Sequence, residues 1–283
     1  PRLLERMGVE CVCVNCEPTG EFAHNPEPLP SNLVELCEAV VANGADFGIS
    51  VDPDVDRLAL ICENGQPFGE EYTLVSVADY LLSRIYNEAL ETGKSIEEIA
   101  APYQMVTSSN LSSSRALRDV TEQYGGEYCT AAVGEVNVTT KMREAGALIG
   151  GEGNGGVIYP ALHYGRDAMV GVALFLTNLA YKKMKVSELR ASYPEYVIAK
   201  NKIELSDSAL IDKILEEVKT VYAAEDINTI DGVKISFEAK KEWVHLRRSN
   251  TEPIIRIYAE AATAEAADAL AQQIIAIANK IIG

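Results

Sequence analysis

The chain is poor in positive charge, and it also lacks the patterns of several common protein classes. Its 283 residues include 25 Lys and Arg against 42 Asp and Glu, a formal net charge of −17. Such a chain repels nucleic acid and anionic lipid overall. The sequence shows no signal-peptide pattern and no apolar run long enough to span a bilayer. We therefore expect a cytoplasmic protein that binds neither nucleic acid nor membrane.

Paired zinc-ligand spacing is absent as well. The six cysteines stand at positions 11, 13, 16, 37, 62 and 129, and the three that lie close together are followed by no His or Cys partner motif. This arrangement favours buried, reduced thiols over a zinc site or a disulfide framework.

What the chain does contain is enough apolar sequence for several packed cores. At 283 residues and 47% hydrophobic content, two or three domains are expected. Strands and helices alternate up to Pro194, and a helix end, a Gly turn and a strand recur at 7–11 and 124–129. This faint repeat predicts two similar α/β domains with mixed sheets between helices. Beyond Pro194 the order of one helix, several strands and a helix predicts a smaller α+β domain. The expected boundaries are 1–98, 99–193 and 194–283.

Periodicity and turn residues predict the individual elements. Helices are expected near 31–43, with Ser31 as N-cap, and near 71–90, 112–124, 137–144, 167–182, 207–222 and 263–282. Strands are expected near 9–14, 47–51, 58–62, 100–107, 127–133, 147–150, 196–204, 233–238, 242–248 and 254–260. Because Pro1 is not an initiator Met and the chain opens inside a βαβ pattern, we expect residues upstream to be missing.

The most informative motif is the run Asp52-Pro53-Asp54-Val55-Asp56-Arg57 between two predicted strands. Three carboxylates at alternate positions repel one another unless a cation neutralises them, and hard oxygen ligands suit Mg²⁺ or Ca²⁺. The adjacent guanidinium suits a phosphate. A solvated acidic turn is the plain alternative. A helix-flanked calcium loop with Glu63 at its twelfth position is disfavoured, because Arg57 stands at the sixth position, where that loop needs Gly.

A second motif is the glycine-rich run at 150–156, which formally contains G-x-G-x-x-G. We reject a dinucleotide site, because no helix follows directly and Glu152 would oppose a pyrophosphate. Glycines let the backbone approach a ligand, and Glu152 and Asn154 offer groups that suit sugar hydroxyls. A purely structural glycine turn is the alternative.

A third motif is the donor-rich loop Arg247-Arg248-Ser249-Asn250-Thr251-Glu252-Pro253, with Arg256 three residues beyond. Guanidinium, hydroxyl, amide and backbone N–H groups together can wrap a phosphate. The alternative is an exposed hairpin with surface arginines, which the strongly acidic composition makes less attractive.

The three motifs, in this order, resemble the α-D-phosphohexomutase superfamily of phosphoglucomutases, phosphomannomutases and phosphoglucosamine mutases. The segments 26–28 and 165–167 also fit. The resemblance implies four domains, of which 1–98, 99–193 and 194–283 resemble the second, third and fourth. We expect the first domain, which in the family carries a catalytic phosphoserine, to be absent here. The run Ala23-His24-Asn25-Pro26 mimics the family's Ser-His-Asn-Pro nucleophile, but we reject it because it lies too close to the acidic loop.

The resemblance also implies a reaction and a division of labour. The intact enzyme would move phosphate between the 1- and 6-positions of a hexose or hexosamine through a bisphosphate intermediate. Asp52, Asp54 and Asp56 would hold Mg²⁺, with Arg57 assisting at the phosphoryl group, and Glu152 and Asn154 would grip the sugar. The phosphate that is not reacting would be held by Arg247, Ser249, Asn250, Thr251 and Arg256.

The general acid and base are less defined. Some relatives have His after the Gly that matches Gly134 and in the sugar loop, where this chain has Glu135 and Gly156. Candidates here are Glu135, His163 and Arg166. We expect this chain alone to be inactive. A non-catalytic phosphosugar-binding module and, more weakly, a metal-dependent phosphatase are the alternatives. The preferred sugar and the oligomeric state stay open.

Overall fold

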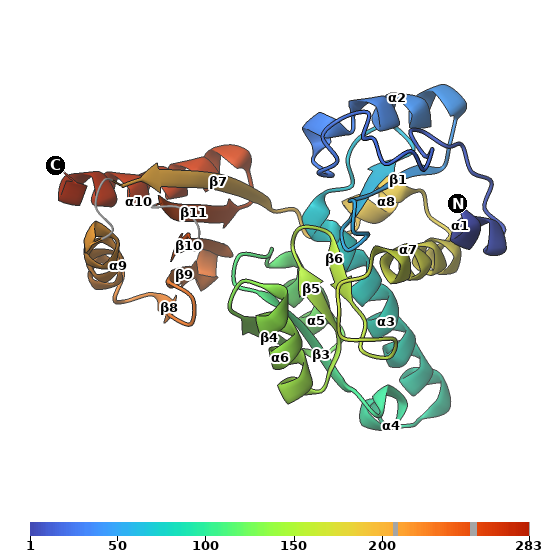
Figure 1. Cartoon of the computed structure of the whole chain (residues 1–283). Helices are drawn as coiled ribbons and strands as arrows, with labels where there is room; N and C mark the ends of the chain where they lie inside the picture. The colour runs from blue at the N-terminus through green and yellow to red at the C-terminus, as the bar shows by residue number, and fades with distance from the viewer. Residues whose placement is uncertain (206–208, 250–253, 283) are drawn as a thin grey trace. The chain divides into compact units, whose positions relative to one another are not determined.

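The chain forms a mixed α/β structure, as the sequence predicts. The computed structural model describes residues 1–205, 209–249 and 254–282 (Figure 1). Contacts divide the chain into two compact units. The first unit comprises Pro1–Ser109, Leu117–Cys129 and Gly134–Tyr193, and the second comprises Asn110–Ala116, Thr130–Val133 and the chain from Pro194 onward.

The elements up to Tyr193 surround two sheets. The helices are α1 (Arg2–Arg6), η1 (Pro30–Asn32), α2 (Val34–Asn43), α3 (Glu70–Thr92), α4 (Ile96–Ala100), α5 (Ala116–Gln123), α6 (Glu135–Ala145), α7 (Ala168–Lys182) and α8 (Val186–Ala191). The strands are β1 (Phe47–Val51), β2 (Leu58–Cys62), β3 (Gln104–Asn110), β4 (Glu127–Ala131), β5 (Ala147–Glu152) and β6 (Gly156–Ile158).

Both chemistry-bearing loops of the first unit are hairpin turns. Strands β1 and β2 pair antiparallel, with Val51 opposite Leu58, so that the acidic run connects them. The other sheet has the order β4-β3-β5-β6. Its strands β5 and β6 pair antiparallel, with Glu152 opposite Gly156, so that the glycine run forms their turn. The backbone around each loop is therefore held by strands on both sides.

Helices α3 and α7 bury the apolar faces of these sheets. The first three turns of α3 are almost wholly buried, and Phe175 on α7 is fully buried. The ring of Phe175 forms T-shaped pairs with Phe47 and Phe68 at centroid distances of 6.2 and 5.4 Å. This aromatic cluster connects α7 with β1 and with the segment that leads into α3, which stabilises the base of the acidic hairpin.

The second unit is an antiparallel sheet with two helices on one face. Its strand order is β7 (Val197–Glu204), β11 (Ile254–Ala261), β10 (Glu242–Arg248), β9 (Val233–Phe237) and β8 (Asp226–Asn228), and η2 (Glu238–Lys240) links β9 to β10. The helices α9 (Ala209–Val221) and α10 (Ala264–Ile282) lie beside it (Figure 1). Its core joins Ile214 on α9 and Ile274 on α10 to Val244 and Ile257 on the strands.

Several local predictions are wrong. Residues 9–14 form no strand in the part of the chain that the structure describes, although their pattern predicts one. Alternating apolar residues indicate β propensity, but a strand also needs a partner edge, and among the described residues β1 pairs only with β2. Ser31 caps no helix, because it lies within η1 and α2 begins three residues later. The short elements α4, α8, β6 and β8 were not predicted, although Ser95 and Glu98 form a capping box at the start of α4.

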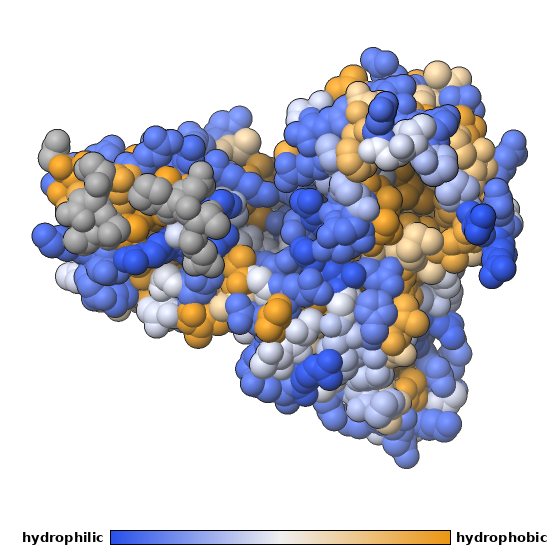
Figure 2. Space-filling model, viewed as in Figure 1, coloured by the Kyte–Doolittle hydropathy of each residue, from blue (hydrophilic) through white to orange (hydrophobic). Residues whose placement is uncertain are grey.

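No helix among the described residues combines the length and the apolar character that a membrane crossing requires. The face drawn in Figure 2 agrees with this, because hydrophilic residues cover much of it and apolar ones are interspersed.

Candidate functional site

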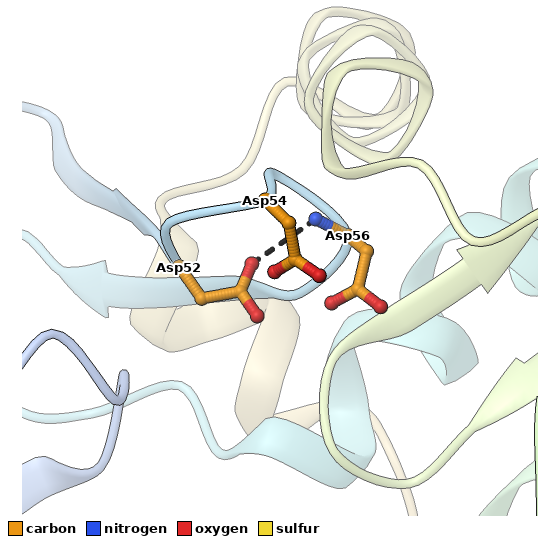
Figure 3. A group of neighbouring side chains, drawn as sticks. All are labelled: Asp52, Asp54 and Asp56. Carbon is orange, nitrogen blue, oxygen red and sulfur yellow. Dashed lines mark hydrogen bonds between the residues drawn. The ribbon is translucent and has the colours of Figure 1, made fainter.

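The acidic loop gathers its three carboxylates on one side. Oxygen atoms of Asp52, Asp54 and Asp56 lie within 4.8 Å of one another, with Asp52 buried, Asp54 exposed and Asp56 between these extremes (Figure 3). Oxygen donors at this spacing suit a hard divalent cation. The geometry thus agrees with a metal site, and these three residues are the ones that would hold the ion.

Asp52 is also the structural centre of the loop. Its Oδ1 accepts hydrogen bonds from the backbone N–H groups of Asp56 and Arg57 at 3.0 and 2.9 Å, and its Oδ2 accepts one from Arg57 Nε at 2.6 Å. Burial alone would raise the pKa of Asp52, but the hydrogen bonds from Arg57 outweigh it and lower that pKa to about 2. Asp52 is therefore an anion at any physiological pH.

The pKa of Asp56 is raised in this loop. Burial raises its pKa, and the hydrogen bond and negative charge of Asp52 raise it further, to about 6, while Arg166 acts in the opposite direction. Burial is the largest cause of this raised pKa, and the neighbouring carboxylates add to it. An additional divalent cation would relieve the repulsion, which is a second reason to regard the loop as a metal site.

The backbone of the loop is unusual at Val55, which has a φ of +60°. A β-branched residue in the left-handed region is strained and persists only where the surroundings hold it. The Val55 carbonyl accepts a hydrogen bond from the N–H of Ala168, the first residue of α7, at 3.0 Å. The start of α7 therefore helps to hold the loop in its shape.

The glycine loop lies directly against the acidic loop. Leu58 N–H donates to the Gly155 carbonyl at 3.0 Å, and Arg57 and Gly156 form an isolated β-bridge. Gly155 has a φ of +87°, and a Cβ there would collide with the Leu58 backbone. Glycine is thus required at this position both for the turn and for the close approach of the two loops.

Arg166 connects the two loops through their carboxylates. Its guanidinium pairs with Asp56, with Glu152 at 2.9 Å and with Glu135 at 3.4 Å, and the side chain is only 17% exposed. Its backbone N–H donates to Glu135 at 2.9 Å. Glu152 also accepts from the Gly134 N–H at 3.1 Å. One arginine therefore connects the acidic loop, the glycine loop and the start of α6.

The remaining sequence candidates of this unit lie around the same place. His163 Nε2 hydrogen-bonds with Asp167 at 2.9 Å, and Asp167 caps α7 through the N–H groups of Met169 and Val170. The ring of His163 is half exposed. Asn154 accepts from the Gly156 N–H at 3.2 Å, which shapes the glycine loop from within.

The candidate phosphate residues belong to the second unit. Arg247 lies near the end of β10 and Arg256 on β11, directly opposite each other in the antiparallel register. The buried Ser249 N–H donates to the Ile254 carbonyl at 3.0 Å. The predicted ligands Asn250 and Thr251 lie outside the described residues.

Two acidic residues at this site were not predicted. The carboxylate of Glu71, in the first turn of α3, lies so close to Gly153 that a Cβ there would collide with it. Glu27 lies 3.5 Å from Arg57 Nη1. Glu27 belongs to the Pro26-Glu27-Pro28 run, which was a possible signal for it. Nothing in the sequence around Glu71 indicates that it lies beside Gly153.

Family models match nearly the whole chain in three successive segments. Residues 1–65 match the phosphoglucomutase/phosphomannomutase α/β/α domain II, residues 76–196 match domain III, and residues 200–277 match the C-terminal domain. The chain belongs to the α-D-phosphohexomutase superfamily.

Individual relatives agree with this assignment. The chain is 37% identical to a phosphoglucomutase/phosphomannomutase of Thermococcus kodakarensis, over 94% of this chain and 55% of that protein. It is 33% identical to a Methanopyrus kandleri protein named "Probable phosphoglucosamine mutase", over 100% of this chain and 59% of that protein. A crystal structure of a phosphoglucomutase/phosphomannomutase family protein from Burkholderia thailandensis superposes with a TM-score of 0.80 at 26% identity, over 99% of this chain and 56% of that one. The chain thus spans a little over half the length of these relatives.

Proposed function

We propose that this chain supplies the metal, sugar and phosphate sites of a phosphohexomutase, which interconverts the 1- and 6-phosphates of a hexose or hexosamine. The observation that carries the proposal is the direct contact between the acidic loop and the glycine loop, with Arg166 bonded to carboxylates of both. We also propose the division into segments 1–98, 99–193 and 194–283, each contributing one of the three loops.

The residues act as follows in this proposal. Asp52, Asp54 and Asp56 hold Mg²⁺, which when bound supplies a Lewis acid and offsets charge on the phosphoryl group that is transferred. Asp52 holds Arg57 through Nε, and Glu27 lies 3.5 Å from Nη1; the Nη groups of this guanidinium contact the same phosphoryl group. Glu152, oriented by Arg166 and Gly134, accepts hydrogen bonds from sugar hydroxyls, with Asn154 beside it.

We assign proton transfer to a residue at the edge of this site. His163 is half exposed and is oriented by Asp167, which is the arrangement that a proton-transferring imidazole needs. Glu135 is held by the Arg166 N–H and guanidinium. We propose His163 before Glu135 for this role, and we assign Arg166 to holding the two loops together. In this proposal the nucleophile is a phosphoserine that this chain does not supply.

The metal assignment can be tested by calorimetry on this chain. Asp54→Asn keeps the size of the side chain and removes one charge, so Mg²⁺ affinity should fall by about tenfold or more. The matched control is Asp46→Asn, an exposed aspartate at the other end of β1, which should leave the affinity unchanged. Equal affinities in the two variants and the parent would contradict the assignment.

The activity can be tested with the 1-phosphates of glucose, mannose and glucosamine. We expect the chain to bind at least one of them in the presence of Mg²⁺, and phosphorus NMR to show no interconversion. Failure to bind all three would refute the proposed function. Turnover would refute only the claim that the nucleophile lies elsewhere.

A phosphosugar-binding module without catalysis would give the same binding result. Reading the coding sequence upstream of Pro1 separates the two: an in-frame Ser-His-Asn-Pro segment supports the mutase, and a native start at this position supports the module.

A further inference from the structure

The sheet of the second unit has one face that its helices do not cover. Val244 and Leu246 on β10 belong to the core with α9 and α10, as do Ile255 and Ile257 on β11. Because side chains alternate along a strand, the residues between them point to the opposite face.

Three cations stand side by side on that face. Arg247 on β10 is directly opposite Arg256 on β11, and Arg256 is in turn directly opposite Lys202 on β7. Directly opposite side chains in an antiparallel sheet have their Cβ atoms about 5 Å apart, and like charges there are destabilising. A row of three cations across neighbouring strands is unexpected in a chain of net charge −17. Glu204 offsets part of this positive charge at Lys202, and an anion bound over the row would offset it further.

The row lies at the open end of the face. Towards the other end, the segment 110–116 covers the sheet: Lys234 donates to the Leu111 carbonyl at 2.7 Å, and the buried Glu260 accepts from the Arg115 N–H at 2.9 Å. At the row itself, the Lys202 side chain is 61% exposed, and Arg247 and Arg256 are partly buried. Arg247 Nε is buried, with no hydrogen-bond partner among the described residues.

We infer that Lys202 is a further phosphate-binding residue, which with Arg247 and Arg256 forms an anion-binding row for the phosphoryl group of a sugar phosphate. This inference rests on the proposed function and extends its phosphate site from the loop onto β7. Glu204, two residues further along β7, pairs with Lys202 at 2.9 Å. Glu204 therefore holds the ammonium group at the edge of the row and also competes with an incoming anion for it.

Neutralising Lys202 and neutralising Glu204 should change the affinity for anions in opposite directions. Calorimetric titration of the full chain with inorganic phosphate and with α-D-glucose 1-phosphate should show about two- to five-fold weaker binding of both for Lys202→Gln, since exposed ion pairs contribute modestly. Glu204→Gln should bind both ligands more tightly. Added salt should reduce both differences, because exposed charges are screened. The matched control, Lys213→Gln, removes an exposed lysine from α9 and should change nothing.

The result separates this inference from the function on which it rests. If Lys202→Gln binds phosphate as the parent does while Arg247→Gln binds it more weakly, the extension onto β7 is wrong and the phosphate loop stands. If Arg247→Gln also binds normally, the phosphate loop itself is wrong. If Lys213→Gln weakens binding as much as Lys202→Gln, the effect belongs to overall charge and the inference fails.

Discussion

Arg166 is the residue on which the described site depends most. It is the counter-charge that Asp56, Glu152 and Glu135 share, and it is largely buried. Removing one partner of a buried ionic cluster leaves the other partners as desolvated, uncompensated charges. The same cation lies beside the proposed metal ligands and opposes the binding of a second cation there. Arg166 should therefore affect stability and metal affinity in opposite directions.

We predict that Arg166→Gln lowers the free energy of unfolding by about 2–4 kcal/mol in the absence of Mg²⁺. Mg²⁺ should bind more tightly to the variant and restore part of the loss, because bound ligand stabilises the folded state. Urea denaturation with and without Mg²⁺ measures both effects. Arg118→Gln is the control, since its ion pair with Glu122 on α5 is exposed and should contribute less than about 1 kcal/mol. An unchanged free energy of unfolding in Arg166→Gln would show that the three carboxylates do not depend on Arg166 for charge compensation.

At the scale of the elements, Asp79 connects helices that are far apart in the sequence. This α3 residue is 3% exposed and pairs with Lys182 at the end of α7. It also accepts hydrogen bonds from the hydroxyls of Tyr124 at 2.8 Å and Tyr193 at 2.9 Å. Burial, and then the charge of Asp79, raise the pKa of both tyrosines, so they stay protonated donors. The network connects α3 and α7, whose first turns contact the two loops through Glu71 at Gly153 and Ala168 at Val55.

We predict that Asp79→Asn costs about 3–5 kcal/mol of unfolding free energy, because Lys182 and one tyrosine lose their acceptor in a buried place. Thermal and chemical denaturation of the first unit within the whole chain, followed by circular dichroism, should show it. Glu91→Gln, at an exposed position near the end of the same helix, should change stability by less than about 0.5 kcal/mol. A loss no larger than that of the control would mean that the network is not required.

At the scale of the whole molecule, pH should act on the second unit through a buried histidine. His245 is 1% exposed; its Nε2 donates to the Asp231 carbonyl at 2.6 Å, and its Nδ1 accepts from the Ser112 hydroxyl at 2.9 Å. Burial, with Lys234 nearby, lowers the pKa of His245 to about 4 from an ordinary 6.5. The folded unit therefore keeps this ring neutral over a range where the unfolded chain protonates it.

The lowered pKa of His245 makes the free energy of unfolding depend on pH. Between about pH 6.5 and pH 4 the unfolded state binds a proton that the folded state does not, so the free energy of unfolding falls as the pH is lowered, by about 3 kcal/mol in total. Trp243, the sole tryptophan, lies two residues away on β10 and reports unfolding of this unit by fluorescence. His245→Gln should remove this part of the pH dependence even if it is less stable at neutral pH. An identical slope in both proteins would contradict the assignment.

Local signals predicted much of the framework. The acidic hairpin was predicted residue for residue at β1 and β2, because an apolar run, a turn and a second apolar run are neighbours in sequence. The strand expected at 9–14 was wrong, because pairing depends on an edge elsewhere. The links of Arg166 to Asp56 and Glu152 were not foreseen, since they join residues that are 110 and 14 positions apart. The row that includes Lys202 likewise exists only through the register of three strands.

The sequence by itself determined the family, the order of the three loops and the type of chemistry that each can support, because these depend on residue identity and short spacing. Only the tertiary structure decided which carboxylates share one guanidinium, which histidine is buried and which cations stand opposite one another. Those features arise when distant segments are packed together, and the low dielectric and close distances of that packing set their energies.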